Sequence, residues 1–309
     1  MNDRHLTCFA AIYEEGTLSL AAERLRVSVS SLSLHLGNLE AQLETQLFRR
    51  HRRGMRPTAA GRQFYDHVRI ILTAMENARR DMQSATKRIT GTVSVTMAGS
   101  AIRAIGFELV ERVRQHYPDL RLILTETLSV IAVDDLDNGR ADIAVAFNPT
   151  ANPGIRAKPI LAEDLVLAGK PEIIGHSTDP VTFDEVLTYP LILLQQGLSA
   201  RALTRDTRLL KRLEAHAQLQ VNSTRTISKS LCAGLGATIG TRLILSRELA
   251  SGALHARPIV SPELERVLYV IERSTDKPSF AVEHIRGLVI ELLEDSVSDG
   301  RWQARLTTQ

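Results

Sequence analysis

Residues 17–40 read TLSLAAERLRVSVSSLSLHLGNLE, and the pattern of this segment indicates how the first part of the chain folds. The sequence predicts two short helices joined by a tight turn at residues 26–28. Thr17 and Ser28 carry hydroxyl groups suited to capping the first and the second helix. Leucines recur along the second helix at spacings of four, three and four, which places them on one helical face. These leucines are Leu32, Leu36, Leu39 and Leu43.

The opposite face of the second helix is made of small residues where a solvated surface helix would usually carry Glu and Lys. Small hydroxyl side chains at the front of a helix suit insertion into the major groove of DNA. Many helix pairs of this kind are purely structural, so this segment alone leaves both interpretations open. The residues of this face are Ser30, Ser31, Ser33, Leu34 and Gly37.

A basic run, FRRHRRGMR, follows at residues 48–56 with five arginines, no acidic residue and one Gly. The usual role of such a run is a solvated charged surface. Here it begins a few residues after the second helix, and residues 50–56 can form a short hairpin. In a hairpin the arginines would lie along the phosphates or enter the minor groove, as the wing of a winged helix does. The two signals together favour DNA binding.

Charge is distributed unevenly along the chain. Residues 1–88 hold 14 basic and 9 acidic residues, whereas the remainder holds 24 basic and 26 acidic ones. The basic part is the part with the helix pair, as nucleic-acid binding requires. The rest of the chain has no electrostatic reason to bind DNA.

Cysteine content and hydropathy predict a cytoplasmic protein. Cys8 and Cys232 lie in different predicted domains, which argues against a disulfide framework. No apolar run reaches the roughly 18 residues of a membrane span. The N-terminal residues lack the basic start and apolar core of a secretory signal.

Residues 58–87 predict one long helix with an apolar stripe along it. The stripe is either packed on the helix's own domain or meets a second copy of the helix in another chain. A single stripe on a helix between two domains favours the second alternative. The stripe consists of Phe64, Val68, Ile71, Leu72, Met75 and Ala78.

From residue 91 onward strands and helices alternate, which predicts parallel α/β sheets. The first group has strands at 91–97, 120–125 and 142–147 with helices at 102–116 and 130–138. The second has strands at 191–194, 219–221 and 238–239 with helices at 201–216 and 226–233. A strand at 268–271 and a helix at 279–293 close the chain. Two α/β lobes, with crossings near Ile160 and Glu265, fit a periplasmic-binding-protein-like pair.

Polar residues follow four of these predicted strands. Ser100 and Ser129 follow strands of the first lobe, and residues 195–199 and 222–224 follow strands of the second. Strand ends of this kind border the crevice where such sheets bind ligands, and helix N-termini there attract anions. The alternative is that each residue only caps a helix. Their convergence predicts a site for a small carboxylate, with Arg103 and Arg225 as candidate counter-charges.

The sequence contains no motif that supports dinucleotide binding, metal binding or catalysis. The run at Gly234, Gly236 and Gly240 is preceded by a predicted helix and followed by a strand, opposite to the order of a dinucleotide-binding loop. The histidines show no metal-ligand spacing, and no catalytic set of Ser, His and Asp stands out. We therefore predict no enzyme activity, no metal and no cofactor other than a small-molecule co-inducer.

The N-terminal block resembles the winged helix-turn-helix of LysR-type transcriptional regulators, and the resemblance extends more weakly over the whole chain. It implies a DNA-binding domain at 1–58, a linker and dimerisation helix at 59–90 and an effector-binding domain at 91–309. The two lobes of that last domain would be 91–161 with 266–309, and 162–265. The matching residues are Phe9, Gly16, Ala21, Ala22, Leu25, Ser33, Leu39, Glu40, Leu43, Leu47, Phe48, Arg49, Pro57, Thr58, Ala60 and Gly61.

The resemblance also implies site residues and partners. Effector contacts would involve Ser100, Ser129, Gln196 and Thr224, and a bound effector would modulate binding to operator DNA. The assembly would be a homotetramer, a dimer of dimers, with RNA polymerase as a further candidate partner. The residues predicted to contact DNA are Thr17, Ser28, Val29, Ser30, Ser33, Leu34, Arg52 and Arg53.

Departures from the family pattern affect these predictions, and Leu34 and Gly37 stand where polar or basic residues are frequent. The recognition helix commonly begins Ser-Gln-Pro or Ser-Gln-Ser, whereas here Val29 follows Ser28 and offers a methyl contact to thymine. Thr241 stands where the family often has Pro. The rival hypothesis is a solute-binding or enzymatic α/β protein whose basic N-terminus is an interaction tail.

Overall fold

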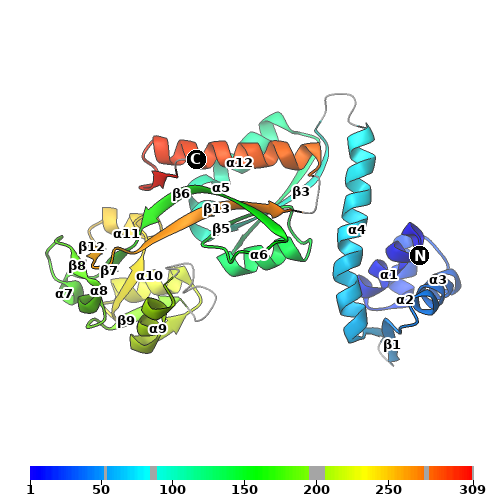
Figure 1. The fold of residues 1–309 in the computed structure, drawn as a ribbon, viewed down its shortest axis with the longest axis horizontal. Helices are drawn as coiled ribbons and strands as arrows, with labels where there is room; N and C mark the ends of the chain where they lie inside the picture. Colours follow the sequence, from blue (N-terminus) through cyan, green and yellow to red (C-terminus); the bar gives the residue numbers. More distant parts are fainter. Residues whose placement is uncertain (52–53, 84–88, 195–205, 275–277, 308–309) are drawn as a thin grey trace. The chain divides into compact units, whose positions relative to one another are not determined.

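The computed structural model describes residues 1–51, 54–83, 89–194, 206–274 and 278–307. The chain divides into two compact units, Met1–Lys87 and Arg88–Gln309, called here the N-terminal and the C-terminal unit (Figure 1). Within the described ranges no helix is long and apolar enough to cross a membrane.

The N-terminal unit contains four helices and a two-stranded hairpin within its described residues. The two caps predicted from sequence are confirmed, because Thr17 accepts a hydrogen bond from the Leu20 amide and Ser28 one from the Ser31 amide. The hairpin pairs its two strands antiparallel. The elements are α1 (Asp3–Glu15), α2 (Leu18–Leu25), α3 (Val29–Gln42), β1 (Phe48–His51), β2 (Gly54–Pro57) and α4 (Ala59–Gln83).

The core of this unit forms around Phe9, whose ring contacts those of Phe48 and Phe64. The leucine face of α3 is buried against it at Leu32, Leu36 and Leu39. The first half of the predicted α4 stripe packs on the same core through Phe64, Val68, Ile71 and Leu72. This part of the stripe therefore covers its own domain, which is the alternative that the sequence argument did not favour.

The described residues of the C-terminal unit form two six-stranded mixed sheets. In the first, ordered β14-β6-β13-β5-β3-β4, only β3, β4 and β5 are parallel neighbours, while β13 runs antiparallel to β5 and β6. The parallel order predicted for the strands at 91–97, 120–125 and 142–147 is therefore confirmed, whereas β6 and β14 were not predicted and β13 joins the sheet antiparallel. The strands are β3 (Gly91–Ala98), β4 (Leu120–Thr127), β5 (Ile143–Phe147), β6 (Ile155–Asp164), β13 (Glu265–Arg273) and β14 (Arg305–Leu306).

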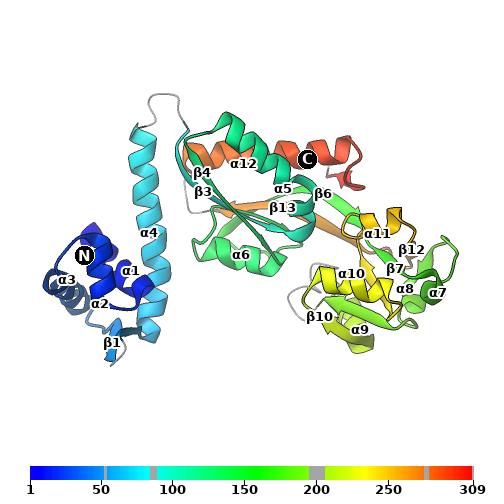
Figure 2. The same cartoon turned by 180° about the vertical axis from the view of Figure 1, so that it is seen from behind.

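Helices cover both faces of this first sheet. Figures 1 and 2 show α5 (Gly99–His116) and α12 (Phe280–Ser298) together on one face and α6 (Ser129–Asp137) on the other. The larger core cluster joins α5 and α12 to the sheet. A smaller cluster joins α6 to β5 and β13.

The second sheet has the order β10-β9-β11-β7-β12-β8. Its β9 pairs in parallel with β10 and β11, whereas β7 runs antiparallel to β11 and β12. The strands are β7 (Val166–Gly169), β8 (Val181–Thr182), β9 (Leu191–Leu194), β10 (Ala217–Val221), β11 (Ala237–Gly240) and β12 (His255–Val260). The helices are α7 (Pro171–Ile174), α8 (Phe183–Val186), α9 (Thr207–His216), α10 (Thr224–Cys232) and α11 (Ser246–Ala250).

Two connections join the sheets. The strand β6 pairs with β13 as far as Asp164, so the chain leaves the first sheet four residues later than the predicted crossing near Ile160. It returns at Glu265, the first residue of β13. The sequence around Pro159 does not look like a strand because Pro cannot donate a ladder hydrogen bond. The register shift next to Pro159 accommodates it as a bulge.

Candidate functional site

The exposed face of α3 carries the side chains predicted to contact DNA. Leu34 is 63% exposed and Val29 44% exposed, and Ser30 is also exposed. Ser33 is half-buried. A surface helix that exposes apolar and hydroxyl side chains opposite a buried leucine face is suited to the edges of bases.

Two of the residues predicted to contact DNA use their hydroxyl groups as helix caps. The Thr17 hydroxyl is used in capping α2. The Ser28 hydroxyl caps α3 and lies 3.0 Å from the Ser30 hydroxyl. Each of these hydroxyls sits at a helix start, where neighbouring backbone N–H groups also point outward.

The hairpin places arginines opposite each other. Arg49 pairs with Arg56 across the two strands, and both side chains are exposed. Directly opposed like charges repel, and neither guanidinium has an acidic partner within the described residues. An anion such as a DNA phosphate would relieve this repulsion. The predicted contacts Arg52 and Arg53 lie outside the described residues.

Two sets of contacts hold the hairpin in place. A carboxylate oxygen of Glu40, on α3, accepts hydrogen bonds from the amides of Leu47 at 2.7 Å and Phe48 at 3.1 Å. On the other strand the Met55 amide donates to the Gly16 carbonyl at 2.7 Å. Gly54 has φ +128°, and a Cβ there would lie 2.4 Å from that same carbonyl oxygen. The hairpin is therefore fixed to both α3 and the turn between α1 and α2.

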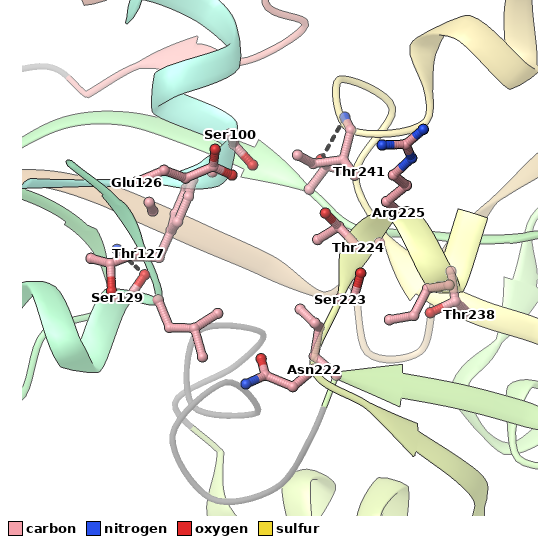
Figure 3. A pocket seen from close by; sticks show the side chains of 18 of the residues that line it. Ser100, Glu126, Thr127, Ser129, Asn222, Ser223, Thr224, Arg225, Thr238 and Thr241 are labelled. Carbon is pink, nitrogen blue, oxygen red and sulfur yellow. Dashed lines mark hydrogen bonds between the residues drawn. The ribbon is translucent and has the colours of Figure 1, made fainter. Parts of the chain in front are cut away.

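The C-terminal unit holds a cavity of about 490 Å³ lined by residues of both sheets (Figure 3). It brings together Ser100, Ser129 and Thr224, which the sequence predicted to share a site. Gln196 lies outside the described residues. The polar described residues of the lining are Ser100, Glu126, Thr127, Ser129, Asn222, Ser223, Thr224, Arg225, Thr238, Thr241 and Arg266.

The two candidate counter-charges differ in position. Arg225 lines the cavity. Arg103 does not, because it lies on the exposed face of α5, where it donates to the Ser246 hydroxyl at 3.3 Å. The prediction for Arg103 is therefore wrong. Ser100 is the second residue of α5 and is buried, whereas Arg103 is the fifth, about one turn farther along the helix, and its side chain is exposed.

Ser100 and Ser129 are not helix caps. The N-cap residues of α5 and α6 are Ala98 and Leu128, and neither provides a side-chain cap. The Ser129 hydroxyl instead accepts a hydrogen bond from the Phe147 amide at 3.0 Å (Figure 3). The first amides of both helices are left without a capping side chain where the helices reach the cavity. Only α10 of these three helices is capped, by Ser223.

A buried ion pair that the sequence did not suggest borders the cavity. Arg266 donates to one Glu163 oxygen at 2.8 and 2.5 Å and to the Ser100 hydroxyl at 2.7 Å. Its guanidinium lies over the Phe147 ring, 3.6 Å from the centroid. Trp302 donates to the other Glu163 oxygen at 2.8 Å. More than 100 residues separate Glu163 from Arg266, so no local pattern predicted this pair.

Glu126 is a second residue that the sequence analysis missed. It is the next-to-last residue of β4, and Figure 3 shows it beside Ser100. A sequence signal existed, since Glu126 precedes Ser129 at the end of a predicted strand. Thr241 lies at the far side of the cavity, where its hydroxyl accepts from the Ile244 amide at 3.4 Å.

Comparison with protein families gives two matches that together cover most of the chain. Residues 4–62 match the model described as "Bacterial regulatory helix-turn-helix protein, lysR family". Residues 86–294 match the model described as "LysR substrate binding domain".

Similar proteins agree with these matches. The nitrogen assimilation regulatory protein nac of Klebsiella aerogenes is 33% identical over 240 residues, covering 77% of this chain and 78% of that protein. Its Escherichia coli (strain K12) counterpart is 30% identical over the same share of both chains.

Solved structures show a similar fold. A full-length OxyR variant from Pseudomonas aeruginosa has a TM-score of 0.74 at 21% identity, covering 100% of this chain and 98% of that one. Full-length CbnR in complex with its target DNA has a TM-score of 0.62 at 22% identity, covering 96% and 100%.

Proposed function

This chain belongs to the LysR family of transcriptional regulators, and on this basis we propose which of its residues bind DNA and effector. A regulator of this family has a helix-turn-helix that binds DNA and a domain that binds an effector. In this proposal the front of α3 and the hairpin β1–β2 contact the operator. The cavity of the C-terminal unit binds a small effector that carries a carboxylate.

The DNA-binding part of the proposal is carried by one observation. The buried leucine face of α3 leaves Val29, Ser30 and Leu34 exposed, and the described part of the hairpin carries the exposed arginines Arg49 and Arg56. The α3 side chains would read base edges, and the hairpin would supply phosphate contacts that act on any sequence. The residues proposed for DNA contact are Thr17, Ser28, Val29, Ser30, Ser33, Leu34, Arg52 and Arg53, and we add Arg49 and Arg56 as phosphate contacts.

The effector part rests on the ends of three helices. The N-termini of α5, α6 and α10 border the cavity, and those of α5 and α6 lack capping side chains. Free N–H groups and the helix dipole favour a bound carboxylate there. The side chains proposed to contact the effector are Ser100, Ser129, Gln196 and Thr224.

An effector between the two sheets would favour one arrangement of them and shift the population of the regulator toward it. We further propose the domain limits given above. We also propose that α4 pairs with α4 of a second copy and that the regulator assembles as a dimer of dimers. Its proposed location is the cytoplasm, and RNA polymerase is a proposed partner. Of the described α4 stripe, Met75 is 38% exposed and remains available for such pairing.

A footprint of the purified protein on the DNA upstream of its own gene tests the proposal. Two related protected half-sites that survive moderate salt are the expected result, and they supply the probe for an effector screen. Arg53→Ala should weaken binding to all sequences and flatten the salt dependence. Ser129→Ala should preserve the footprint but blunt the effector response. Protection without defined edges that disappears at moderate salt would contradict sequence-specific binding.

A further inference from the structure

Glu126 is a feature of the cavity that an effector with negative charge alone does not explain. Its side chain lines the cavity beside Ser100 (Figure 3). Within the described ranges its carboxylate has neither a hydrogen-bond nor an ion-pair partner. A purely anionic ligand would have to enter the cavity against this charge.

The other charges of the lining define two poles. The charge of Arg266 is balanced by Glu163, which is 2% exposed and bonded to it. Among the described lining residues this leaves Glu126 and Arg225 as the charged groups without an ion-pair partner. Glu126 belongs to the first sheet, and Arg225 to the α10 helix on the second. The cavity therefore offers one negative and one positive contact on opposite walls (Figure 3).

The position of Glu126 also decides which helix ends remain available to an anion. A Cβ on Gly99 would lie 3.0 Å from the Glu126 carboxylate oxygen, so this charge lies directly against the first residue of α5. A carboxylate there offsets the positive end of the α5 dipole. The N-termini of α6 and α10, at Ser129 and Thr224, keep their attraction for a ligand carboxylate.

We infer that the effector is a small zwitterion of the amino-acid type, with its protonated amine on Glu126 and its carboxylate between the N-termini of α6 and α10. The inference rests on the proposed function of this cavity. A volume of about 490 Å³ suits a small molecule. A charge-assisted contact between an ammonium group and a carboxylate is stronger than a neutral hydrogen bond, so Glu126 would set the specificity.

Binding to the full-length protein tests this inference with matched pairs of probes. Each L-amino acid is compared with the acid of the same skeleton that lacks the α-amine, by calorimetry and by the shift in thermal unfolding. At least one amino acid should bind while its deaminated partner does not. Glu126→Gln should weaken the binding of that amino acid by about 10-fold or more. The same substitution should improve binding of the deaminated acid, because it removes the repulsion. Glu294→Gln, an exposed carboxylate on α12, is the matched control and should change neither affinity.

The two proposals fail in different ways. The zwitterion inference is overturned if no amino acid binds, if deaminated acids bind equally well, or if Glu126→Gln leaves the preference unchanged. In the last two cases, loss of binding in Ser129→Ala would still support the cavity as the effector site. Binding that survives Ser129→Ala unchanged would overturn the proposed site itself.

Discussion

The guanidinium of Arg266 donates a hydrogen bond of 2.7 Å to the hydroxyl of Ser100. Arg266 lies on β13, by which the chain returns to the first sheet, and Ser100 lies on the first turn of α5 at the cavity. The same guanidinium is bonded to Glu163 on β6, by which the chain leaves that sheet. An effector that forms a hydrogen bond with the Ser100 hydroxyl in place of Arg266 would therefore affect the side chain that links the two connecting strands, β6 and β13.

Removal of the Arg266 charge should destabilise the C-terminal unit strongly. Arg266→Met leaves the 2%-exposed Glu163 carboxylate without its partner, at an expected cost of about 3–5 kcal/mol in the free energy of unfolding. Urea unfolding followed by Trp302 fluorescence measures this directly, since Trp302 is the only Trp and donates to Glu163. Arg266→Met combined with Glu163→Gln should recover part of the loss. A loss below about 1 kcal/mol in the single variant would contradict a buried ion pair.

Glu40 should be required for the position of the hairpin relative to α3. Its carboxylate accepts two backbone amides at the start of β1. Glu40→Ala should therefore cost about 2–3 kcal/mol of stability in the N-terminal unit and weaken DNA binding on every sequence. Glu40→Gln keeps one acceptor oxygen and should lose less. Electrophoretic mobility shifts with specific and unrelated DNA measure the binding, and an unchanged affinity in Glu40→Ala would count against this role.

Two glycines should respond to Ala in opposite directions. Gly54→Ala places a Cβ 2.4 Å from the Gly16 carbonyl at φ +128°, and we expect a loss of about 2 kcal/mol or more. Gly37 lies inside α3 with open space around it, so Gly37→Ala should add about 1 kcal/mol to helix stability. Chemical unfolding of both variants, followed by helical circular dichroism, makes the comparison. Equal effects of the two substitutions would refute the proposed close approach.

Arg49 and Arg56 should each contribute a phosphate contact. Ala at either position should lower the slope of log affinity against log salt by about 1, on specific and unrelated DNA alike. Fluorescence anisotropy over a salt series gives the slope. Lys211→Ala, an exposed base on α9, serves as the control and should leave it unchanged. A selective loss on the operator alone would show instead that these arginines read bases.

The N-terminal unit should lose stability on mild acidification. Burial, the neighbouring His35 and the terminal amine hold the pKa of His5 below its usual 6.5. The folded protein therefore binds a proton at His5 less readily than the unfolded chain does. The contribution of His5 to the free energy of unfolding is fully present above pH 6.5 and decreases as the pH falls through 6.5 toward the folded pKa. Hydrogen exchange of α1 and α3, corrected for intrinsic rates, should show faster opening at low pH. His5→Gln should reduce that dependence, and an identical pH profile in the variant would exclude His5 as the cause.

Much of the N-terminal unit was predictable because its signals are local. The caps at Thr17 and Ser28 act on amides three residues away, and the leucine face of α3 repeats within one helix. The alternating strands and helices after residue 91 were predictable as well, because the period-two spacing of a strand and the 3.6-residue spacing of a helix are visible within a single element. The strand β6 was not predicted, and the sequence left the direction of β13 open, because antiparallel pairing between distant segments leaves no periodic pattern in either segment.

The candidate effector site likewise contains residues that local patterns predicted and contacts between distant residues that they did not. Local sequence patterns were enough to place Ser100, Ser129 and Thr224 after strands and at helix starts, and parallel α/β units bring such positions to one crevice. No local pattern predicted that Arg266 contacts Glu163 and Ser100 or that the Glu126 charge lies against Gly99, and these contacts became visible only in the folded chain. Pairing of charges far apart in the chain depends on how the sheets pack, and packing is a property of the whole fold.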